Sequence, residues 1–393
     1  MSAKIFLKSG KEQSIMRLHP WVFSGAIKNI QGTPTEGDLV SVYTNRGEFL
    51  AWGHYQPTSI AVRILTFENR VPDKQFFKSK IEQAINFRQN VGFFDDPNTN
   101  VFRLIHGEGD GLSGLVVDFY NKTLVFQAHS VGMYLLKEMI CEILIELLGS
   151  AVTAIYDKSS QTLPFKAEVK ATDGYLYGGQ SENVVVEHGR KFEIDWENGQ
   201  KTGFFIDQRE NRQLLADYSK GKNVCNIFGY TGGFSIYALS AGASLVHTVD
   251  VSKLAIEQTN RNVELNFGNS ANHEGFAMDA FDFFAKTTNK YDVIILDPPA
   301  FAKHQSALHN ALQGYKRINQ RAIEQIAKGG ILFTFSCSQA VSREDFRKAV
   351  FAASVNAKRN VRILHQLSQP IDHPIGMFHP ESEYLKGLVL YVD

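Results

Sequence analysis

The sequence predicts a multidomain protein with a small N-terminal β-barrel, a central α+β domain and a C-terminal doubly wound, Rossmann-like α/β domain. Three observations lead to this prediction. The chain has 393 residues, which is too long for one ordinary domain. Short β-rich segments separated by turn residues fill positions 1–68. From about residue 220 onward, strand-like and helix-like segments alternate, which is typical of a mostly parallel sheet covered by helices.

The N-terminal domain is placed at residues 1–70. Segments 39–43 and 60–65 are rich in β-forming residues, and Gly, Pro and Asn break the chain between them. Pro72 marks the expected boundary. The domain carries eight Lys and Arg against five Asp and Glu, a net +3 in a chain whose formal charge is zero. This bias permits a contact with RNA, although such a small imbalance is also common on a solvated face.

The middle segment, 73–190, is predicted to be a central α+β domain. Apolar residues recur there with a helical period in two places and with strand-like spacing elsewhere. It contains no recognisable catalytic constellation. The expected elements are a helix over 73–90, a β-hairpin of 115–120 and 124–128, an amphipathic helix over 132–148 ended by Gly149, and a strand over 152–156.

The remainder, 191–393, is predicted to fold around a doubly wound sheet with helices on both faces. In such sheets, ligands bind beyond the carboxyl ends of the strands, where the strand order reverses. The expected strands cover 223–228, 245–250, 274–278, 291–296, 330–335, 361–366 and 385–392. The expected helices cover 233–241, 253–266, 280–286, 306–327 and 343–355.

Composition narrows the cellular setting. No stretch approaches eighteen consecutive apolar residues, so no membrane span is expected. The first residues are followed by charges rather than by an apolar segment, which argues against secretion. The three cysteines have no metal-like spacing, and their odd number favours a reducing cytoplasm without disulfides. We therefore expect a cytoplasmic protein without a metal site.

A glycine-rich loop after the first strand of this domain is a candidate cofactor site. Glycines allow a tight turn and a close backbone approach to a ligand, and the following helix offers free N–H groups. The spacing differs from the dinucleotide fingerprint, and the lysine of a P-loop is missing. A purely structural turn has the same appearance. The loop consists of Phe228, Gly229, Tyr230, Thr231, Gly232 and Gly233.

Acidic residues end the next two strands. Asp250 could accept hydrogen bonds from both hydroxyls of a ribose. Asp279 could accept from an adenine amino group, or it could simply N-cap the helix that follows. The loop, these two residues and Asp297-Pro298-Pro299 occur in this order, each at a predicted strand end. This arrangement resembles the class I S-adenosylmethionine methyltransferases far more than any dehydrogenase.

The segment 198–212, upstream of the glycine loop, allows two interpretations. It is dense in polar and aromatic residues without clear periodicity and then becomes a helix. It could be a loop that links two domains and is capped by Asp207. Alternatively, it could fold over the cofactor and supply Gln208 and Arg209 to it.

Cys337 and Asp297 are the candidate catalytic residues. Each follows an apolar strand, and a helical crossover between parallel strands would bring both to the same sheet edge. A thiolate that adds to C6 of a cytosine makes C5 nucleophilic enough to accept a methyl group. Asp297 could hold N3 and the exocyclic amino group. The polar neighbours of Cys337 argue against a merely buried thiol, whereas Cys225 and Cys141 are expected to be core residues.

The motif Asp297-Pro298-Pro299 has a second interpretation. In enzymes that methylate exocyclic amino groups, a D-P-P-aromatic motif holds the amine. Here Ala300 separates Pro299 from Phe301, so the match is imperfect, and such an enzyme needs no thiol. A third alternative is a non-catalytic RNA-binding or assembly factor that retains the cofactor.

Over nearly its full length the sequence resembles the 23S rRNA (cytosine-C5) methyltransferases that carry an N-terminal PUA domain. Several long motifs in one order make this resemblance specific. They are His19-Pro20-Trp21-Val22-Phe23-Ser24-Gly25-Ala26-Ile27, the segment from Gln200 to Arg209, Phe228 to Phe234, Asp297 to Phe301, Phe335-Ser336-Cys337-Ser338, His373-Pro374 and Tyr384-Leu385-Lys386-Gly387.

The resemblance implies a PUA domain, a central α+β domain, a Rossmann-like methyltransferase domain, S-adenosyl-L-methionine as cofactor and Cys337 as nucleophile. The implied partner is 23S rRNA or a precursor of the large ribosomal subunit, and an apolar helix of the middle domain could serve a homodimer. Many RNA cytosine-C5 methyltransferases carry a second cysteine beside the motif of Asp297, which this chain lacks. The base that removes the C5 proton is therefore unassigned.

Overall fold

The computed structural model describes residues 2–164, 167–302 and 304–393. The predicted ranges 1–70, 73–190 and 191–393 include residues 1, 165–166 and 303 respectively, which lie outside the described residues. The chain divides into two compact units, each made of three pieces. Unit 1 comprises Met1–Val185, Ile194–Phe204 and Ile371–Ser382, and unit 2 comprises Val186–Glu193, Phe205–Pro370 and Glu383–Asp393.

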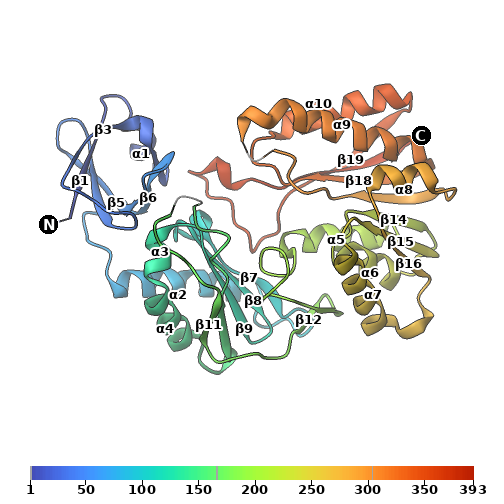
Figure 1. The fold of residues 1–393 in the computed structure, drawn as a ribbon, viewed down its shortest axis with the longest axis horizontal. Coiled ribbons are helices and arrows are strands. Elements are labelled where there is room, and N and C mark those ends of the chain that lie inside the picture. Colours follow the sequence, from blue (N-terminus) through green and yellow to red (C-terminus); the bar gives the residue numbers. More distant parts are fainter. Residues whose placement is uncertain (1, 165–166, 303) are drawn as a thin grey trace. The chain divides into compact units, whose positions relative to one another are not determined.

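Unit 1 begins with a six-stranded sheet in the order β2-β6-β5-β4-β1-β3, drawn in blue in Figure 1. All pairs are antiparallel except β1 with β4. Its core consists of alternate apolar residues such as Val40, Val42 and Val62. The predicted strands 39–43 and 60–65 are confirmed. The elements are β1 (Lys4–Leu7), α1 (Gln13–Met16), β2 (Trp21–Phe23), β3 (Ile27–Gln31), β4 (Leu39–Tyr43), β5 (Phe49–Tyr55) and β6 (Ile60–Thr66).

The second part of unit 1 is a five-stranded sheet in the order β11-β10-β9-β8-β7, which packs against helices (Figure 1). The predicted hairpin is β8 and β9, joined by Asn121 in a left-handed conformation. The elements are α2 (Lys74–Asn90), β7 (Val101–His106), β8 (Leu115–Tyr120), β9 (Thr123–Ala128), α3 (Val131–Leu135), α4 (Lys137–Leu148), β10 (Ala154–Asp157) and β11 (Gly174–Tyr177). A separate two-stranded sheet, most of whose residues belong to unit 2, pairs β12 (Val184–Glu187) with β13 (Arg190–Glu193).

The helix predicted over 132–148 is wrong in one respect, because it is broken into α3 and α4. Leu136 leaves the helical conformation, with φ −98° and ψ 6°, and its N–H bonds the carbonyl of Met133. No proline or glycine lies at the break itself. Ser130 caps α3, and Gly132 lies against the His54 ring so closely that a Cβ would overlap it. Tertiary packing of α3 therefore overrides a helical periodicity that continues along the sequence.

A late segment of the chain completes unit 1. The guanidinium of Arg88 is fully buried, and it donates to the Asp372 carbonyl oxygen at 2.7 Å and to Asp110 at 2.6 Å. Its Nε donates to the carbonyl oxygen of Arg103 at 2.9 Å. A buried charge of this kind is tolerated only when it is paired and fully hydrogen-bonded. Arg88 therefore makes the folding of α2 depend on residues more than two hundred and eighty positions away.

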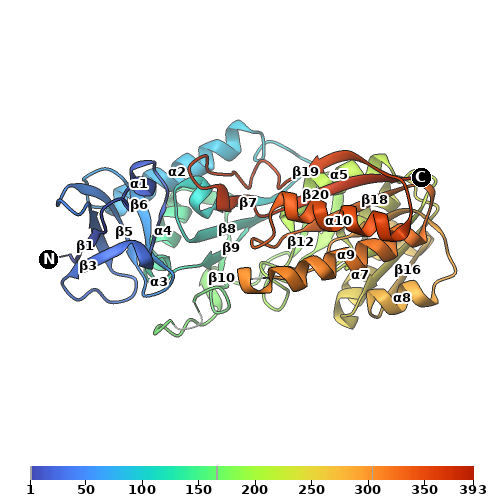
Figure 2. The same ribbon diagram turned by 90° about the horizontal axis from the view of Figure 1, so that it is seen from above.

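Unit 2 contains a seven-stranded sheet in the order β16-β15-β14-β17-β18-β20-β19. The first five strands are parallel, and β20 is antiparallel to both of its neighbours. Figure 2 shows β18, β20 and β19 side by side. The strand order reverses between β14 and β17, so the carboxyl ends of these two strands flank the expected ligand site. The strands are β14 (Asn223–Ile227), β15 (Leu245–Asp250), β16 (His273–Ala277), β17 (Tyr291–Leu296), β18 (Ile326–Ser336), β19 (Val361–Leu367) and β20 (Lys386–Val392).

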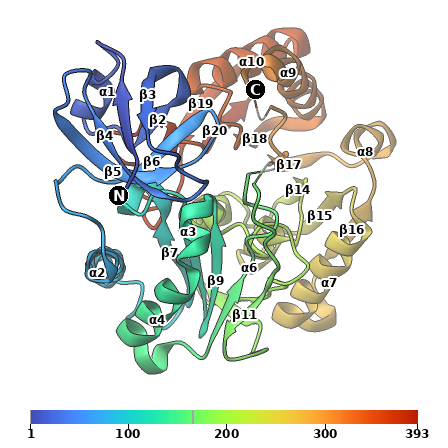
Figure 3. The same ribbon diagram turned by 60° about the vertical axis from the view of Figure 1, so that its left-hand side comes forward.

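Helices cover both faces of this sheet, as the sequence predicts. Figure 3 shows α9 and α10 on one side of the sheet and α6 and α7 on the other. Two apolar cores result, one with residues of α8, α9 and α10 and one with residues of α5 and α6. No helix within the described ranges is long and apolar enough to cross a membrane. The helices are α5 (Arg209–Asp217), α6 (Gly233–Ser240), α7 (Lys253–Phe267), α8 (Ala280–Lys286), α9 (Leu308–Gln325) and α10 (Arg343–Ala357).

Candidate active site

The glycine-rich loop connects β14 to α6 and is held by the end of β15. The N–H of Gly229 donates to the Val249 carbonyl oxygen at 3.0 Å, and the N–H of Tyr230 donates to Asp250 Oδ2 at 3.0 Å. Phe228 and Tyr230 both have positive φ, 63° and 46°. Such conformations are unfavourable for residues with side chains and persist where the surrounding structure enforces them, often at ligand sites.

Two glycines of this loop are required by the protein's own packing. A Cβ on Gly229 would overlap Cγ2 of Thr248. Gly232 has φ +80°, and a Cβ there would lie 2.6 Å from Cγ2 of Thr259. The loop therefore lies directly on the side chains of β15 and α7. This packing role is compatible with the cofactor interpretation, because a turn this close to the sheet also brings backbone groups to its carboxyl edge.

The two acidic strand ends differ in their surroundings. Asp250 accepts from Tyr230 N–H through one oxygen and from Ser252 N–H, at 2.9 Å, through the other. Asp279 N-caps α8 by accepting from the N–H groups of Phe281, at 2.7 Å, and Asp282, at 3.3 Å. The capping interpretation of Asp279 is therefore correct, and only Oδ1 is used for it. Each carboxylate retains lone pairs that can accept from a ribose or an adenine.

These groups fit S-adenosylmethionine. A nucleoside cofactor requires acceptors for its hydroxyl and amino groups and a backbone that it can approach closely, and both lie at the carboxyl ends of β14, β15 and β16. The buried Oδ1 of Asn226, at the end of β14, has no hydrogen-bond partner within the described part of the chain, so a polar atom remains available beneath the loop. Asp250 and the loop backbone would hold the cofactor, which would supply an activated methyl group.

Asp297 follows β17 and is linked to the segment before α5. Nε2 of Gln208 donates to Asp297 Oδ2 at 3.0 Å, and Oε1 of Gln208 accepts from Asn211 Nδ2 at 2.6 Å. The Gln208 amide thus binds Asp297, a candidate catalytic residue. The sequence did not suggest this hydrogen bond. Arg209 is fully buried, and its Nε lies 3.1 Å from Glu210.

One interpretation of the sequence expected Asp207 to cap the segment before α5, and the structure differs. No side chain caps α5, whose N-cap position is Gln208. Asp207 instead accepts from the hydroxyl of Tyr384 at 2.7 Å. Phe205 places its ring edge against Tyr230 of the glycine loop, with centroids 5.1 Å apart. The segment therefore contacts both the glycine-rich loop and Asp297 within unit 2.

Cys337 follows β18 directly, and β18 pairs in parallel with β17. The two strands therefore end at the same edge of the sheet, where the sequence predicts that Cys337 and Asp297 lie close together. Cys337 is half-buried, whereas Cys141 and Cys225 are buried as expected. Burial raises the pKa of Cys141 to about 11 and that of Cys225 still further, so neither thiol ionises near neutral pH.

The serines beside Cys337 are structural. Both are fully buried. Ser336 Oγ donates to the Tyr315 hydroxyl at 2.9 Å, and Ser338 Oγ donates to the Ala302 carbonyl oxygen. Their hydrogen bonds fix the turn that carries the thiol. The polar residues around Cys337 thus indicate a turn held by hydrogen bonds rather than solvent exposure.

Lys386 is a residue of this site that the sequence analysis quoted only as part of a motif. It opens β20, is 3% exposed, and its Nζ donates to the Ser338 carbonyl oxygen at 2.6 Å. Burial lowers its pKa to about 8, and the Cys337 thiolate acts in the opposite direction. A lysine at the start of an otherwise apolar strand, Gly387-Leu388-Val389-Leu390, was the signal available in the sequence.

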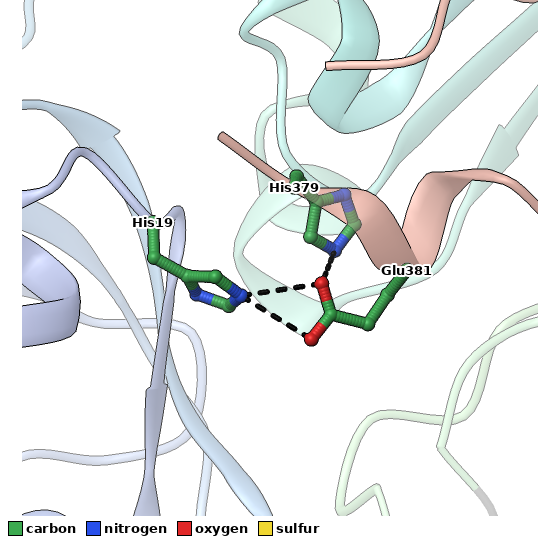
Figure 4. A group of neighbouring side chains, drawn as sticks. All are labelled: His19, His379 and Glu381. Atoms are coloured by element: carbon green, nitrogen blue, oxygen red, sulfur yellow. Dashed lines mark hydrogen bonds and ion pairs between the residues drawn. The ribbon is translucent and has the colours of Figure 1, made fainter. Parts of the chain in front are cut away.

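Unit 1 contains a second group of polar side chains, His19, His379 and Glu381 (Figure 4). Glu381 Oε2 lies 3.3 Å from Nε2 of His19 and 3.7 Å from Nε2 of His379. Burial lowers the pKa of His379 and favours the neutral imidazole, which is the form that binds metal. The donor atoms lie within 4.8 Å of one another, so these residues could hold a divalent ion. His19 is far in sequence from His379 and Glu381, so no sequence motif indicates this group.

Comparison with known proteins places the chain among methyltransferases. A family model described as S-adenosylmethionine-dependent methyltransferase matches residues 151–375, and a PUA-like domain matches residues 5–67. Ribosomal RNA large subunit methyltransferase I of Aeromonas hydrophila is 41% identical over 99% of both chains. The protein of the same name from Aliivibrio fischeri is 39% identical over 100% of both chains.

Solved structures show the same fold. A candidate SAM-dependent methyltransferase from Streptococcus mutans has a TM-score of 0.86 and 22% identity, with both chains fully covered. A candidate methyltransferase complexed with SAH has a TM-score of 0.87 and 23% identity over the full length of both chains. The predicted fold class, with a PUA-like N-terminal domain and a Rossmann-like methyltransferase domain, is confirmed, as is the cofactor S-adenosylmethionine. The chain belongs to the S-adenosylmethionine-dependent methyltransferases with a PUA-like domain, in the family of the ribosomal RNA large subunit methyltransferase I proteins.

Proposed function

We propose that this protein methylates C5 of a cytosine in 23S rRNA through a covalent adduct with Cys337. The observation that carries the proposal is the half-buried thiol of Cys337, which follows β18 just as Asp297 follows the neighbouring β17, at the carboxyl edge of the methyltransferase sheet. The full-length relatives named as large-subunit rRNA methyltransferases support the substrate class. The proposed domains are a PUA domain at 1–70, a central domain at 73–190 and a methyltransferase domain at 191–393.

The chemistry requires a nucleophile because C5 of cytosine is a poor attacking atom. The Cys337 thiolate forms a bond to C6, and the electron pair of the C5–C6 double bond makes C5 nucleophilic. S-adenosylmethionine supplies the methyl group that C5 receives. A base then takes the C5 proton, the C5–C6 double bond forms again, and the electrons of the S–C6 bond return to sulfur.

In this proposal Asp297 binds the base at N3 and at the exocyclic amino group. Gln208 holds one carboxylate oxygen of Asp297 at 3.0 Å and is itself held by Asn211, so the carboxylate has a fixed orientation. Fixed donors and acceptors of this kind reduce the reorganisation needed in the transition state. Asp250, Asp279, Arg209 and the loop from Phe228 to Gly233 are proposed to serve the cofactor.

The alternative methylation of an amino group receives no support from the surroundings of Phe301. In an amino-group methyltransferase the aromatic residue after Asp-Pro-Pro must face the substrate. Here the Phe301 ring packs against Tyr315, with centroids 4.7 Å apart, and joins the apolar core under α9. The partly buried Phe301 ring is thus held by Tyr315 and the core rather than standing open for a substrate base.

The test is methylation of rRNA from cells that lack this protein, followed by mass spectrometry of the nucleosides. The wild-type protein should produce 5-methylcytidine, and Cys337→Ala should reduce the rate at least about a thousandfold while binding the cofactor normally. Cys141→Ala is the matched control, because its thiol lies in α4 of unit 1, and it should retain activity.

A second measurement identifies the covalent step. RNA that carries 5-fluorocytidine should trap a protein–RNA adduct at Cys337, because fluorine cannot leave C5 as a proton does. N6-methyladenosine as product, or full activity of Cys337→Ala, would refute the proposal. Tight RNA binding without any methyl transfer would instead indicate a non-catalytic factor.

A further inference from the structure

Lys386 is bound to the turn that carries Cys337. In the antiparallel pair of β18 and β20, Lys386 lies opposite Ser336. Its Nζ reaches past the end of β18 to the Ser338 carbonyl oxygen, at 2.6 Å. The lysine side chain therefore spans the chain from the residue before Cys337 to the residue after it. Because Lys386 is 3% exposed, this position is fixed by the sheet rather than by a mobile surface side chain.

A buried ammonium group requires a compensating partner. Burial disfavours the charged form of Lys386, and the Cys337 thiolate is the strongest influence that favours it. Arg343 and Glu383 act more weakly and in opposite directions, and they form an ion pair with each other. The described part of the chain gives Nζ one hydrogen-bond acceptor, the Ser338 carbonyl oxygen. Carbonyl oxygens carry no formal charge, whereas the Cys337 thiol in the same turn can ionise and supply an anion beside this cation.

Two other ionisable groups near the turn, Tyr315 and Asp297, carry no positive charge. Tyr315, on α9, has its pKa raised to about 12, first by burial and, more weakly, by the charges of Cys337 and Asp297, so it stays a neutral phenol. Asp297 is an acid and repels a thiolate. An ammonium group beside the turn therefore favours ionisation of Cys337, since electrostatic attraction between two groups acts equally on both.

We propose that Lys386 is a positioning residue that holds Cys337 as a thiolate before substrate binds. This inference rests on the proposed role of Cys337 as nucleophile. The thiol proton goes to solvent when the ion pair forms. The sulfur electron pair then forms the bond to C6, and these electrons return to sulfur when the adduct breaks, so the thiolate is restored beside the same ammonium group.

The test is the alkylation of Cys337 by iodoacetamide in the full-length protein, without RNA or cofactor. The rate is measured between about pH 5.5 and pH 9.5 by mass spectrometry of the peptide that contains Cys337. Because only the thiolate reacts, the rate reports its population at each pH. The wild-type midpoint should lie below the ordinary thiol value of about 8.5. A wild-type midpoint at or above that value would overturn the proposal, whatever the variants do.

Lys386→Met keeps the length of the side chain and removes its charge. It should slow alkylation at pH 7 about tenfold or more and move the midpoint to higher pH by a unit or more. Lys386→Arg should restore part of the wild-type profile. Lys348→Met is the matched control, because Lys348 is exposed on α10 and pairs with Glu344, and its profile should equal that of the wild type. Superimposable profiles of Lys386→Met and the wild type would refute the inference.

The alkylation experiment and the methylation experiment test the two proposals separately. If Cys337 ionises with the help of Lys386 but rRNA gains no 5-methylcytidine, the proposed function is wrong and the electrostatic inference stands. If 5-methylcytidine forms with wild-type protein while alkylation does not depend on Lys386, the function stands and the inference is wrong. Unchanged cofactor binding by Lys386→Met shows that the variant is folded.

Discussion

Different chemical groups form the two sides of the carboxyl edge of the sheet in unit 2. On the side of β14 and β15, the candidate cofactor site consists mainly of backbone groups and glycines, held by Thr248, Thr259 and Asp250. On the side of β17, β18 and β20, the candidate catalytic site consists of side chains joined by buried hydrogen bonds. Backbone sites are specified by short local motifs, whereas side-chain networks depend on distant elements. We therefore expect substitutions on the first side to weaken cofactor binding and substitutions on the second side to slow methyl transfer.

Among the substitutions that compare the two sides, the largest effect is expected for Asp297→Asn on the catalytic side. The asparagine keeps the shape but loses the charge, and it alters the hydrogen bond from Gln208. The turnover number should fall about a hundredfold or more, because a group that acts mainly in the transition state affects kcat. Cofactor affinity, measured by calorimetry, should stay within about a factor of three. A large loss of cofactor affinity would mean that the two halves are not separable.

Gly232→Ala tests the cofactor side. The added Cβ would lie 2.6 Å from Thr259 Cγ2, at a residue with φ +80°. We expect a loss of about 2 kcal/mol in the free energy of unfolding, from strain and overpacking. Cofactor affinity should fall about tenfold, because the loop must move, while alkylation of Cys337 should be unaffected. Gly242→Ala, also at positive φ but with open space around it, controls for backbone strain alone.

A smaller effect is expected for the stability of Lys386→Met. The pKa of Lys386 is lowered on folding, so the unfolded chain binds more protons than the folded chain between about pH 8 and the ordinary lysine value of about 10.4. The buried charge therefore destabilises the fold below pH 8, and this penalty disappears as the pH rises. At pH 7 the methionine variant should be more stable by about 1–2 kcal/mol, and the advantage should vanish near pH 10. Urea denaturation at both pH values measures this, and a less stable variant at pH 7 would contradict it.

The sequence was most informative where structure depends on local pattern. The strands 245–250 and 291–296 and the helix 280–286 were predicted with their observed bounds, because each has clear periodicity and a polar residue at its end. The neighbourhood of Asp297 and Cys337 could be predicted because two successive parallel strands joined by a crossover usually lie side by side.

The remaining parts of the site depend on information that a motif does not contain. Lys386 reaches the turn of Cys337 only because β20 inserts antiparallel between β18 and β19. Gln208 precedes the sheet in sequence and was expected at the cofactor, yet its amide donates to Asp297. Similarly, the break at Leu136 follows from the packing of α3. In each case the decisive contact joins residues whose proximity is fixed by strand order or packing.

The interleaved composition of the two units limits how this protein can be dissected. Unit 1 takes Ile194–Phe204 and Ile371–Ser382 from beyond its main piece, and Arg88 depends on the carbonyl of Asp372. A fragment that ends near residue 185 would leave that guanidinium buried without one of its acceptors, and a fragment that begins there would carry the missing pieces unfolded. A fragment designed to test RNA binding by unit 1 must therefore also contain Ile194–Phe204 and Ile371–Ser382, for example through a circular permutation. Without them, a lost activity cannot be attributed to the loss of a domain.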